Sequence, residues 1–408
     1  MKHLRTAFLA FILSALLLMP SLATAQGKWT ASSTDGFTPR TYPCAASVDG
    51  IIYVFGGFST ILATGAQSTC EAYDPTTDKW ITPDLSGIMT ARGGASASVV
   101  DGKIYVVGGS DASGTALNSV QLLDPIAGEW FTYKSTGSMT ARNRHCAAVV
   151  GGKIYIIGGA QSTTYQTKVE VLDPVAKVWS SLTTTGTFSP RRASAVAVID
   201  DKIYVFGGFN GAAYLNTLEV FDPATNTWST PSVSGEPLPR AGAAAAVVDG
   251  KMYIIGGYNG ALPDIIEEFD PKTNSWTTIN TEGQFSTRSG VALATVGNRH
   301  YIIGGSQSDP IAPYNEYLTF PPSSVHNTSE ESLLRLSPNP TGNLLKIENI
   351  PANTLRLSIV NLLGEQVAEV VNPTDPLTTI NLNNSPAGMY IVRIVTQAGT
   401  VTRMIVKE

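Results

Sequence analysis

A block of about 50 residues recurs six times along this chain, and the repetition limits the folds open to it. Each block holds two short apolar segments joined by a turn with glycine, and a pair of glycines ends the second segment. The pairs, spaced 52, 50, 49, 49 and 48 residues apart, are Gly56 and Gly57, Gly108 and Gly109, Gly158 and Gly159, Gly207 and Gly208, Gly256 and Gly257, and Gly304 and Gly305. One such hairpin is marginal in water, so the copies must pack on one another. A period of this length built from short strands predicts a propeller array.

Three other residue types keep the same period. An arginine stands 16 residues before each pair, namely Arg40, Arg92, Arg142, Arg191, Arg240 and Arg288, and a tyrosine stands three residues before it, namely Tyr53, Tyr105, Tyr155, Tyr204, Tyr253 and Tyr301. The tryptophans are Trp29, Trp80, Trp130, Trp179, Trp228 and Trp276, and the last five follow an Asp-Pro by six residues. Over residues 28–320 this set resembles the kelch repeat. The resemblance implies a β-propeller, with the tryptophans and glycine pairs as structural positions.

Each repeat divides into four strands, which we name a to d. Strand a follows the arginine, strand b ends in the glycine pair, strand c precedes Asp-Pro and strand d carries the tryptophan. Trp29 has no Asp-Pro before it, and the segment 314–320 has neither Asp-Pro nor tryptophan after it. We therefore expect residues 28–33 to supply the missing strand d of the last repeat. The predicted fold is all-β, a six-bladed propeller closed by the N-terminal strand, which leaves no open sheet edge.

The segments before and after the repeats differ from them in composition. Residues 1–25 are predicted to be a signal peptide, since Lys2 and Arg5 precede an apolar run and a small-residue cleavage site. The apolar run is too short to span a bilayer, and we expect no transmembrane segment elsewhere. We expect the propeller over residues 26–320 and a polar linker over residues 321–332.

Residues 333–408 read as a second, smaller β-rich unit. Three segments, 337–340 (Ser-Pro-Asn-Pro), 361–364 (Asn-Leu-Leu-Gly) and 385–390 (Ser-Pro-Ala-Gly-Met-Tyr), resemble the type A C-terminal sorting domain of the type IX secretion system of Bacteroidota. Ser337 departs from that family, which often has an aromatic residue before Pro-Asn-Pro. The resemblance implies a small Ig-like β-sandwich that engages the type IX secretion machinery. It also implies export to the cell surface, in association with the outer membrane, or secretion.

The net charge bears on the class of partner, and the cysteines bear on the core. The net charge is −5, and −5 − 2 = −7 without Lys2 and Arg5, which argues against a nucleic-acid partner because such partners need a basic surface. The cysteines Cys44, Cys70 and Cys146 are interpreted as small buried residues, with a Cys44–Cys70 disulfide as the alternative.

The d–a and b–c connections share one face of a propeller, and two departures from the repeat suggest a ligand site there. Two residues after the repeated arginine, four blades have glycine or alanine, whereas the other two have Tyr42 and Arg144. Just beyond two of the glycine pairs stand the other residues that we expect to contact a ligand, namely Phe209, Asn210, Tyr258 and Asn259. The expected partner on this d–a/b–c face is a protein or peptide, or an acidic glycan. The alternative for the asparagines is a turn role, and for the repeated arginines a structural hydrogen bond.

The sequence shows no signature of catalysis. His145, His300 and His326 have neither the number nor the spacing of a metal site, so we expect no metal and no cofactor. No nucleophile elbow, phosphate-binding loop or calcium loop occurs. We therefore expect a non-catalytic binding or scaffold module, with a structural surface protein as a further possibility. The enzymatic alternative is a sialic acid mutarotase, whose acid and base groups would come from scattered acidic residues, Asp111, Glu236, Asp264 and Glu282.

Overall fold

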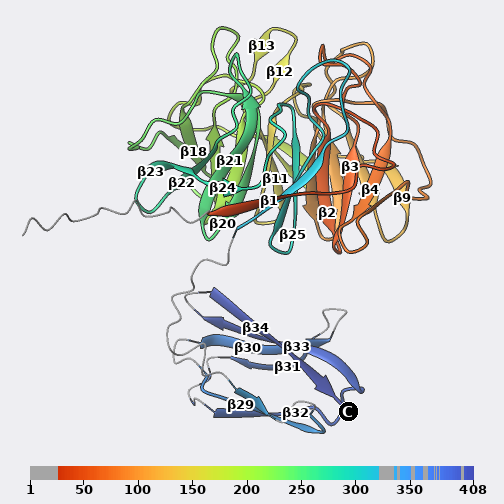
Figure 1. Ribbon diagram of the computed structural model, residues 1–408, viewed down its shortest axis with the longest axis vertical. Coiled ribbons are helices and arrows are strands. Elements are labelled where there is room, and N and C mark those ends of the chain that lie inside the picture. The colour runs from red at the N-terminus through yellow and green to blue at the C-terminus, as the bar shows by residue number, and fades with distance from the viewer. Residues whose placement is uncertain are drawn as a thin grey trace, which may run out of the picture. The chain divides into compact units, whose positions relative to one another are not determined.

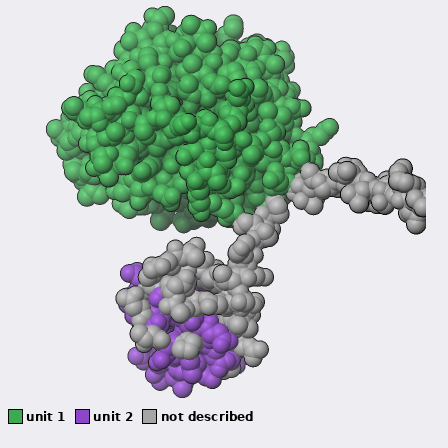
Figure 2. Space-filling model, turned by 90° about the vertical axis from the view of Figure 1, so that its left-hand side faces the viewer, with its two compact units in different colours: residues 1–321 green, residues 322–408 purple. Residues whose placement is uncertain are grey.

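The computed structural model describes residues 26–320, 335–337, 341–350, 354–361, 366–371, 373, 375, 377–396 and 399–408. The predicted signal peptide and linker lie outside these residues. The chain divides into two compact units, residues 1–321 and 322–408 (Figure 2). Every regular element in the described part of both units is a strand, so the fold is all-β. No helix in the described residues is long and apolar enough to cross a membrane.

In the first unit, strands of four kinds recur in sequence order (Figure 1). The a strands are β2 (Cys44–Val48), β6 (Ser96–Val100), β10 (Cys146–Val150), β16 (Ala195–Ile199), β20 (Ala241–Val248) and β25 (Ala292–Val296). The b strands are β3 (Ile51–Phe55), β7 (Lys103–Val107), β11 (Lys153–Ile157), β17 (Lys202–Phe206), β21 (Lys251–Tyr258) and β26 (Arg299–Ile303). The c strands are β4 (Cys70–Asp74), β8 (Val120–Asp124), β14 (Val169–Asp173), β18 (Leu218–Asp222), β22 (Ile266–Asp270) and β27 (Asn315–Thr319). The d strands are β5 (Lys79–Ile81), β9 (Glu129–Thr132), β15 (Val178–Ser181), β19 (Thr227–Ser229), β23 (Ser275–Ile279) and β1 (Gly27–Ala31).

Each repeat forms one antiparallel sheet in the order a, b, c, d. The strand beside β27 is β1 from the N-terminus, with Trp29 opposite Leu318 (Figure 1). A two-residue strand, β24 (Thr281–Glu282), extends this sheet by pairing parallel to β1, and β12 (Ala160–Gln161) with β13 (Thr164–Tyr165) forms a separate hairpin. The a strands contact one another in the order β2, β6, β10, β16, β20, β25 and again β2. Their small side chains allow this approach, and the resulting fold is β-propeller-like.

The glycine pairs join neighbouring sheets. The second glycine of each pair donates its amide to the carbonyl of the next repeated arginine, as Gly57 does to Arg92 at 2.9 Å. The last pair returns to the first repeat, because Gly305 donates to Arg40 at 2.9 Å. Gly57 has a φ of +95°, and a Cβ there would lie 3.0 Å from the carbonyl oxygen of Thr41. Only glycine meets both requirements without strain, which explains why the pair recurs.

The apolar core lies between adjacent sheets. Phe55 packs edge-on against Trp130 of the following sheet, with ring centroids 5.4 Å apart. Phe206 packs on Trp276 of the following sheet in a tilted arrangement, with ring centroids 4.7 Å apart. The six tryptophans are 3% to 8% exposed, so they belong to this core and are closed to a ligand.

The second unit holds two antiparallel sheets with its own core. One contains β28 (Arg335–Ser337), β29 (Leu344–Glu348) and β32 (Leu377–Asn381). The other contains, in spatial order, β31 (Gln366–Val371), β30 (Thr354–Asn361), β33 (Gly388–Thr396) and β34 (Gly399–Lys407). Leu345 and Ile347 of the first sheet pack with Leu357, Ile359 and Val392 of the second. Of the three segments quoted for the sorting-domain resemblance, 338–340 and 362–364 lie outside the described residues.

Candidate functional site

Six residues at the d–a connections form a closed ring of backbone hydrogen bonds. They are Tyr42, Gly94, Arg144, Ala193, Gly242 and Gly290, and each amide donates to the carbonyl of the preceding member at 2.7–3.0 Å. The ring closes because Tyr42 donates to Gly290. All six have φ between +49° and +71°, a region that favours glycine. Tyr42 and Arg144 are therefore held in an unfavourable backbone conformation, which the ring stabilises.

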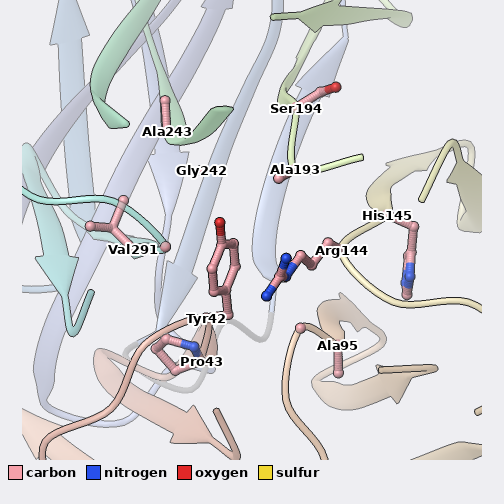
Figure 3. A pocket seen from close by; sticks show the side chains of 12 residues that line it. Tyr42, Pro43, Ala95, Arg144, His145, Ala193, Ser194, Gly242, Ala243 and Val291 are labelled. Atoms are coloured by element: carbon pink, nitrogen blue, oxygen red, sulfur yellow. The ribbon is translucent and has the colours of Figure 1, made fainter. Parts of the chain in front are cut away.

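These two residues carry the large side chains of a pocket of about 110 Å³ at the ring. In Figure 3 the ring of Tyr42 stands at the centre and the guanidinium of Arg144 reaches toward it. The Arg144 Cζ lies 4.2 Å from the Tyr42 ring centroid, in cation–π geometry. The glycines leave room for this pair, since a Cβ at Gly290 would lie 2.9 Å from the Tyr42 ring and one at Gly94 would lie 3.0 Å from Cγ of Arg144.

Arg144 has no counter-ion among the described residues. Burial lowers the pKa of its guanidinium, the phenol of Tyr42 opposes that shift, and the positive charge of Arg192 adds to it. The rest of the pocket lining is small or apolar, apart from His145 and Ser194. The positive charge of a half-buried cation without a carboxylate partner is not neutralised, so an anionic group of a ligand could pair with it.

The structure divides the predicted site residues into two groups. Tyr42 and Arg144 lie together, whereas Phe209 and Tyr258 are joined through Tyr214, with ring centroids 5.2 and 5.6 Å from it. The Oδ1 atoms of Asn210 and Asn259 accept backbone amides of their own turns, at 2.8–2.9 Å and 3.2 Å. Their side-chain oxygens are thus used locally.

Three residues of this face escaped the sequence analysis, namely Tyr165, Arg192 and Tyr214. The Arg192 Cζ lies 5.7 Å from the Tyr165 ring centroid and 5.8 Å from that of Phe209. Arg192 follows the repeated Arg191 directly, and this doubled arginine was a signal available in the sequence. Tyr165 and Tyr214 each stand six residues after the second glycine of a pair, 49 residues apart, so the period of the repeat was a signal for them as well.

The repeated arginines are structural. All six are at most 1% exposed, and each donates to the carbonyl of the first glycine of its pair, as Arg142 does to Gly158 at 3.0 Å. Five of them also pair with a buried glutamate on strand c, for example Arg40 with Glu71 at 2.7 Å and Arg191 with Glu219. Arg92 instead donates to Gln121 at 2.9 Å. The repetition of the arginines predicted a structural hydrogen bond, whereas their glutamate partners were not predicted.

The histidines and cysteines also serve the core. His145 is buried, its Nε2 lies 2.9 Å from the Ser96 hydroxyl, and burial lowers its pKa to about 3. His300 is buried against Phe320. All three cysteines are free, so the alternative of a Cys44–Cys70 disulfide is wrong. Among the described residues no group of three or more His, Cys, Asp and Glu side chains could hold a metal ion.

The acidic residues of the enzymatic alternative do not reach the pocket. None of Asp111, Glu236, Asp264 and Glu282 lines it. The Asp111 carboxylate accepts from Ser113 and Thr115 within its own loop. Glu282 pairs with Lys28 on the surface, at 3.4 Å.

The fold and the repeats define an all-β, propeller-like repeat protein followed by a separate β unit. The chain belongs to the kelch-repeat family, because the model described as KLHDC2/KLHL20/DRC7 Kelch-repeats domain matches residues 17–159 and 139–305. The model for the secretion system C-terminal sorting domain matches residues 335–408. Residues 335–408 are therefore a type IX sorting domain, which supports export to the cell surface or the medium.

Individual relatives match short stretches. Spermatocyte protein spe-26 of Caenorhabditis elegans is 36% identical over 85 residues, which is 20% of this chain and 14% of the relative. Kelch-like ECH-associated protein 1A of Danio rerio is 36% identical over 76 residues, 17% of this chain and 12% of the relative. N-acetylneuraminate epimerase of Pasteurella multocida is 38% identical over 72 residues, 17% of this chain and 19% of the relative. The chain thus spans less than a fifth of the length of these curated relatives.

Proposed function

We propose that this protein is an exported, non-catalytic binding module that captures an acidic group of a partner protein at the ring of d–a connections. The observation that carries the proposal is Arg144, a half-buried guanidinium that lies over the Tyr42 ring and has no counter-ion in the described part of the chain. Arginine presents a planar fork of donors that matches a carboxylate. The pocket of about 110 Å³ is smaller than the 300–1,000 Å³ typical of sites that enclose a whole small molecule. A single acidic side chain or chain terminus suits it better.

The surrounding face supplies contacts for the rest of the partner. Phe209, Tyr214 and Tyr258 form a chain of aromatic contacts, and Tyr258 is 39% exposed. Arg192 adds a second positive charge beside Tyr165. Aromatic and arginine side chains dominate the energetics of protein interfaces, which favours a protein partner over a purely polar glycan.

We further propose a six-bladed propeller closed by the N-terminal strand. The antiparallel pairing of β1 with β27 supports this closure, as do the two backbone hydrogen-bond rings that return to the first repeat. A closed ring fixes the six d–a connections around one axis, which is how Tyr42 and Arg144, about 100 residues apart in sequence, come to face each other. The residues that precede Gln26 would direct the chain across the inner membrane as a signal peptide.

The second candidate is a mutarotase, favoured by the local identity to N-acetylneuraminate epimerase. Mutarotation needs an acid or base beside the sugar. The pocket lining contains no carboxylate, and the lowered pKa of His145 keeps that residue neutral near pH 7. The geometry therefore favours binding.

A peptide and glycan array probed with the full chain and with Arg144→Ala tests the proposal. We expect acidic peptides to bind the parent chain and to lose signal with the variant. Binding confined to acidic glycans would show that the partner is a glycan and not a protein. Accelerated anomerisation of N-acetylneuraminate, followed by NMR, would establish the second candidate instead.

A further inference from the structure

Two pockets flank one ion pair at the opposite end of the sheets from the ring of d–a connections. One of about 350 Å³ lies beside β17 to β19, and one of about 500 Å³ lies between the turns of the third and fourth repeats. Both are lined by Lys202 and Asp222, whose Nζ and Oδ2 lie 3.6 Å apart. Because the strands of each sheet are antiparallel, the a–b and c–d turns that line these pockets lie away from Arg144. We call the two pockets together the groove, and it is independent of the site proposed above.

One position beside the smaller pocket varies between repeats. Three residues after the tryptophan, the second, third and fifth repeats have Tyr133, Leu182 and Ile279, whereas the first and fourth have Pro83 and Pro231. In the second repeat Tyr133, three residues after the tryptophan, packs edge-on against Tyr105 at 5.3 Å and covers it. The corresponding residue of the fourth repeat is Pro231, which leaves Tyr204 lining a pocket. In the fifth repeat the Tyr253 hydroxyl donates to Glu268 at 2.6 Å. The Tyr204 ring has Phe269 as a neighbour, with ring centroids 6.1 Å apart. The Tyr204 hydroxyl makes no hydrogen bond to another described residue.

The turn beside the larger pocket departs from the repeat as well. Asp200 and Asp201 form the a–b turn with φ of +49° and +58°. Where Asp201 stands, four of the other repeats have a glycine, namely Gly50, Gly102, Gly152 and Gly250, and the sixth has Asn298. A backbone with positive φ costs more conformational free energy at an aspartate than at a glycine. Asp201 lines the larger pocket. The sequence therefore accepts backbone strain at a position that faces the groove.

The lining has the chemistry of a carbohydrate site. The Tyr204 ring, Val220 and Pro231 offer an apolar surface to the C–H face of a sugar ring. Side chains that both donate and accept hydrogen bonds surround it, namely Thr225, Thr227, Ser229 and Asn274.

Charge decides between neutral and acidic sugars. The two pockets together have two lysines, Lys153 and Lys202, against three aspartates, Asp200, Asp201 and Asp222. The resulting 2 − 3 = −1 charge disfavours an anionic ligand. The volumes fall within the 300–1,000 Å³ range of small-molecule sites. We propose that this groove binds a neutral oligosaccharide, with one sugar on Tyr204 and the next toward Asp201.

The test is titration of the full chain with cellobiose, maltose, lactose and N,N′-diacetylchitobiose, followed by ligand-observed NMR and calorimetry. Pro231→Tyr restores the arrangement of the second repeat and should weaken binding at least tenfold while the protein stays folded. Tyr204→Phe removes one hydroxyl and should weaken binding about fivefold, the effect of one neutral hydrogen bond. The matched control, Tyr105→Phe, changes a covered tyrosine and should leave affinity unchanged.

Asp201→Gly separates a binding role from a structural one. It should raise the melting temperature, because the turn gains a residue suited to its conformation, and it should lower the affinity. The proposal is overturned if none of the four disaccharides binds, or if binding survives Pro231→Tyr or Asp201→Gly unchanged. Preferential binding of digalacturonic acid would overturn it as well, since the groove would then select anions.

Discussion

The guanidinium of Arg144 lies 4.2 Å from the ring centroid of Tyr42, although the two residues belong to the third and first repeats. Their amides belong to the same backbone ring, through Gly94, which lies between them. Both break a position that is otherwise glycine or alanine. The pair therefore marks a place where the sequence departs from the repeat, and the proposed site is built on it.

Arg144→Ala should weaken binding of an acidic partner by about 1.5–3 kcal/mol, the range for a hydrogen bond to a charged group. Stability should change little, because Ala193 already occupies the equivalent position and no carboxylate of a described residue pairs with Arg144. Calorimetric titration with an acidic peptide from the array and a thermal melt measure the two effects. Arg192→Ala, which removes the second positive charge of this face, is the companion variant. Unchanged affinity in Arg144→Ala would reject the site.

Trp179→Ala should destabilise the propeller-like unit by about 3–5 kcal/mol, as expected for a large aromatic side chain removed from a core. Trp179 is 8% exposed and packs among Ile154, Ile156 and Leu172. Chemical denaturation of the variant measures the loss. An unchanged midpoint would contradict the packing role of the repeated tryptophans.

Acid should destabilise the protein through His145. Burial holds the pKa of His145 at about 3 in the folded state, against about 6.5 in an unfolded chain. The unfolded chain thus binds more protons between these values, so the contribution is complete above about pH 6.5 and is lost as the pH falls toward 3. From pH 6.5 to 4.5 the loss is about 2–3 kcal/mol.

His145→Gln removes this titration and can still bond to Ser96. Denaturation at several pH values should therefore show a flatter stability profile for the variant. Parallel profiles for the two proteins would exclude His145 as the source.

Removal of residues 26–34 should promote association. The deletion takes away β1 and leaves β27 as an unpaired edge, which is a template for pairing with another chain. Light scattering and size-exclusion chromatography of the shortened chain measure the effect. A monomer with the stability of the parent would contradict closure by the N-terminal strand.

Removal of residues 333–408 should leave a folded propeller that is no longer exported. The two compact units have separate cores, and the sorting domain lies entirely in the second. In a host with type IX secretion, immunoblots of cell fractions should find the shortened chain in the periplasm. Parental amounts at the surface or in the medium would refute the assigned role of the C-terminal domain.

The sequence by itself determined the kelch repeat, the sorting domain and the places where the repeat is broken. It could do so because glycine pairs, tryptophans and arginines answer local demands that recur at a fixed period, such as the left-handed backbone at Gly57. The tertiary structure decided which side chains meet. Arg144 and Tyr42 meet, Phe209 and Tyr258 meet through Tyr214, and Tyr204 is left uncovered beside Pro231. Arg144 and Tyr42 belong to different repeats, and the other contacts depend on how loops and side chains pack. Their geometry therefore follows from tertiary packing and not from the period of the sequence.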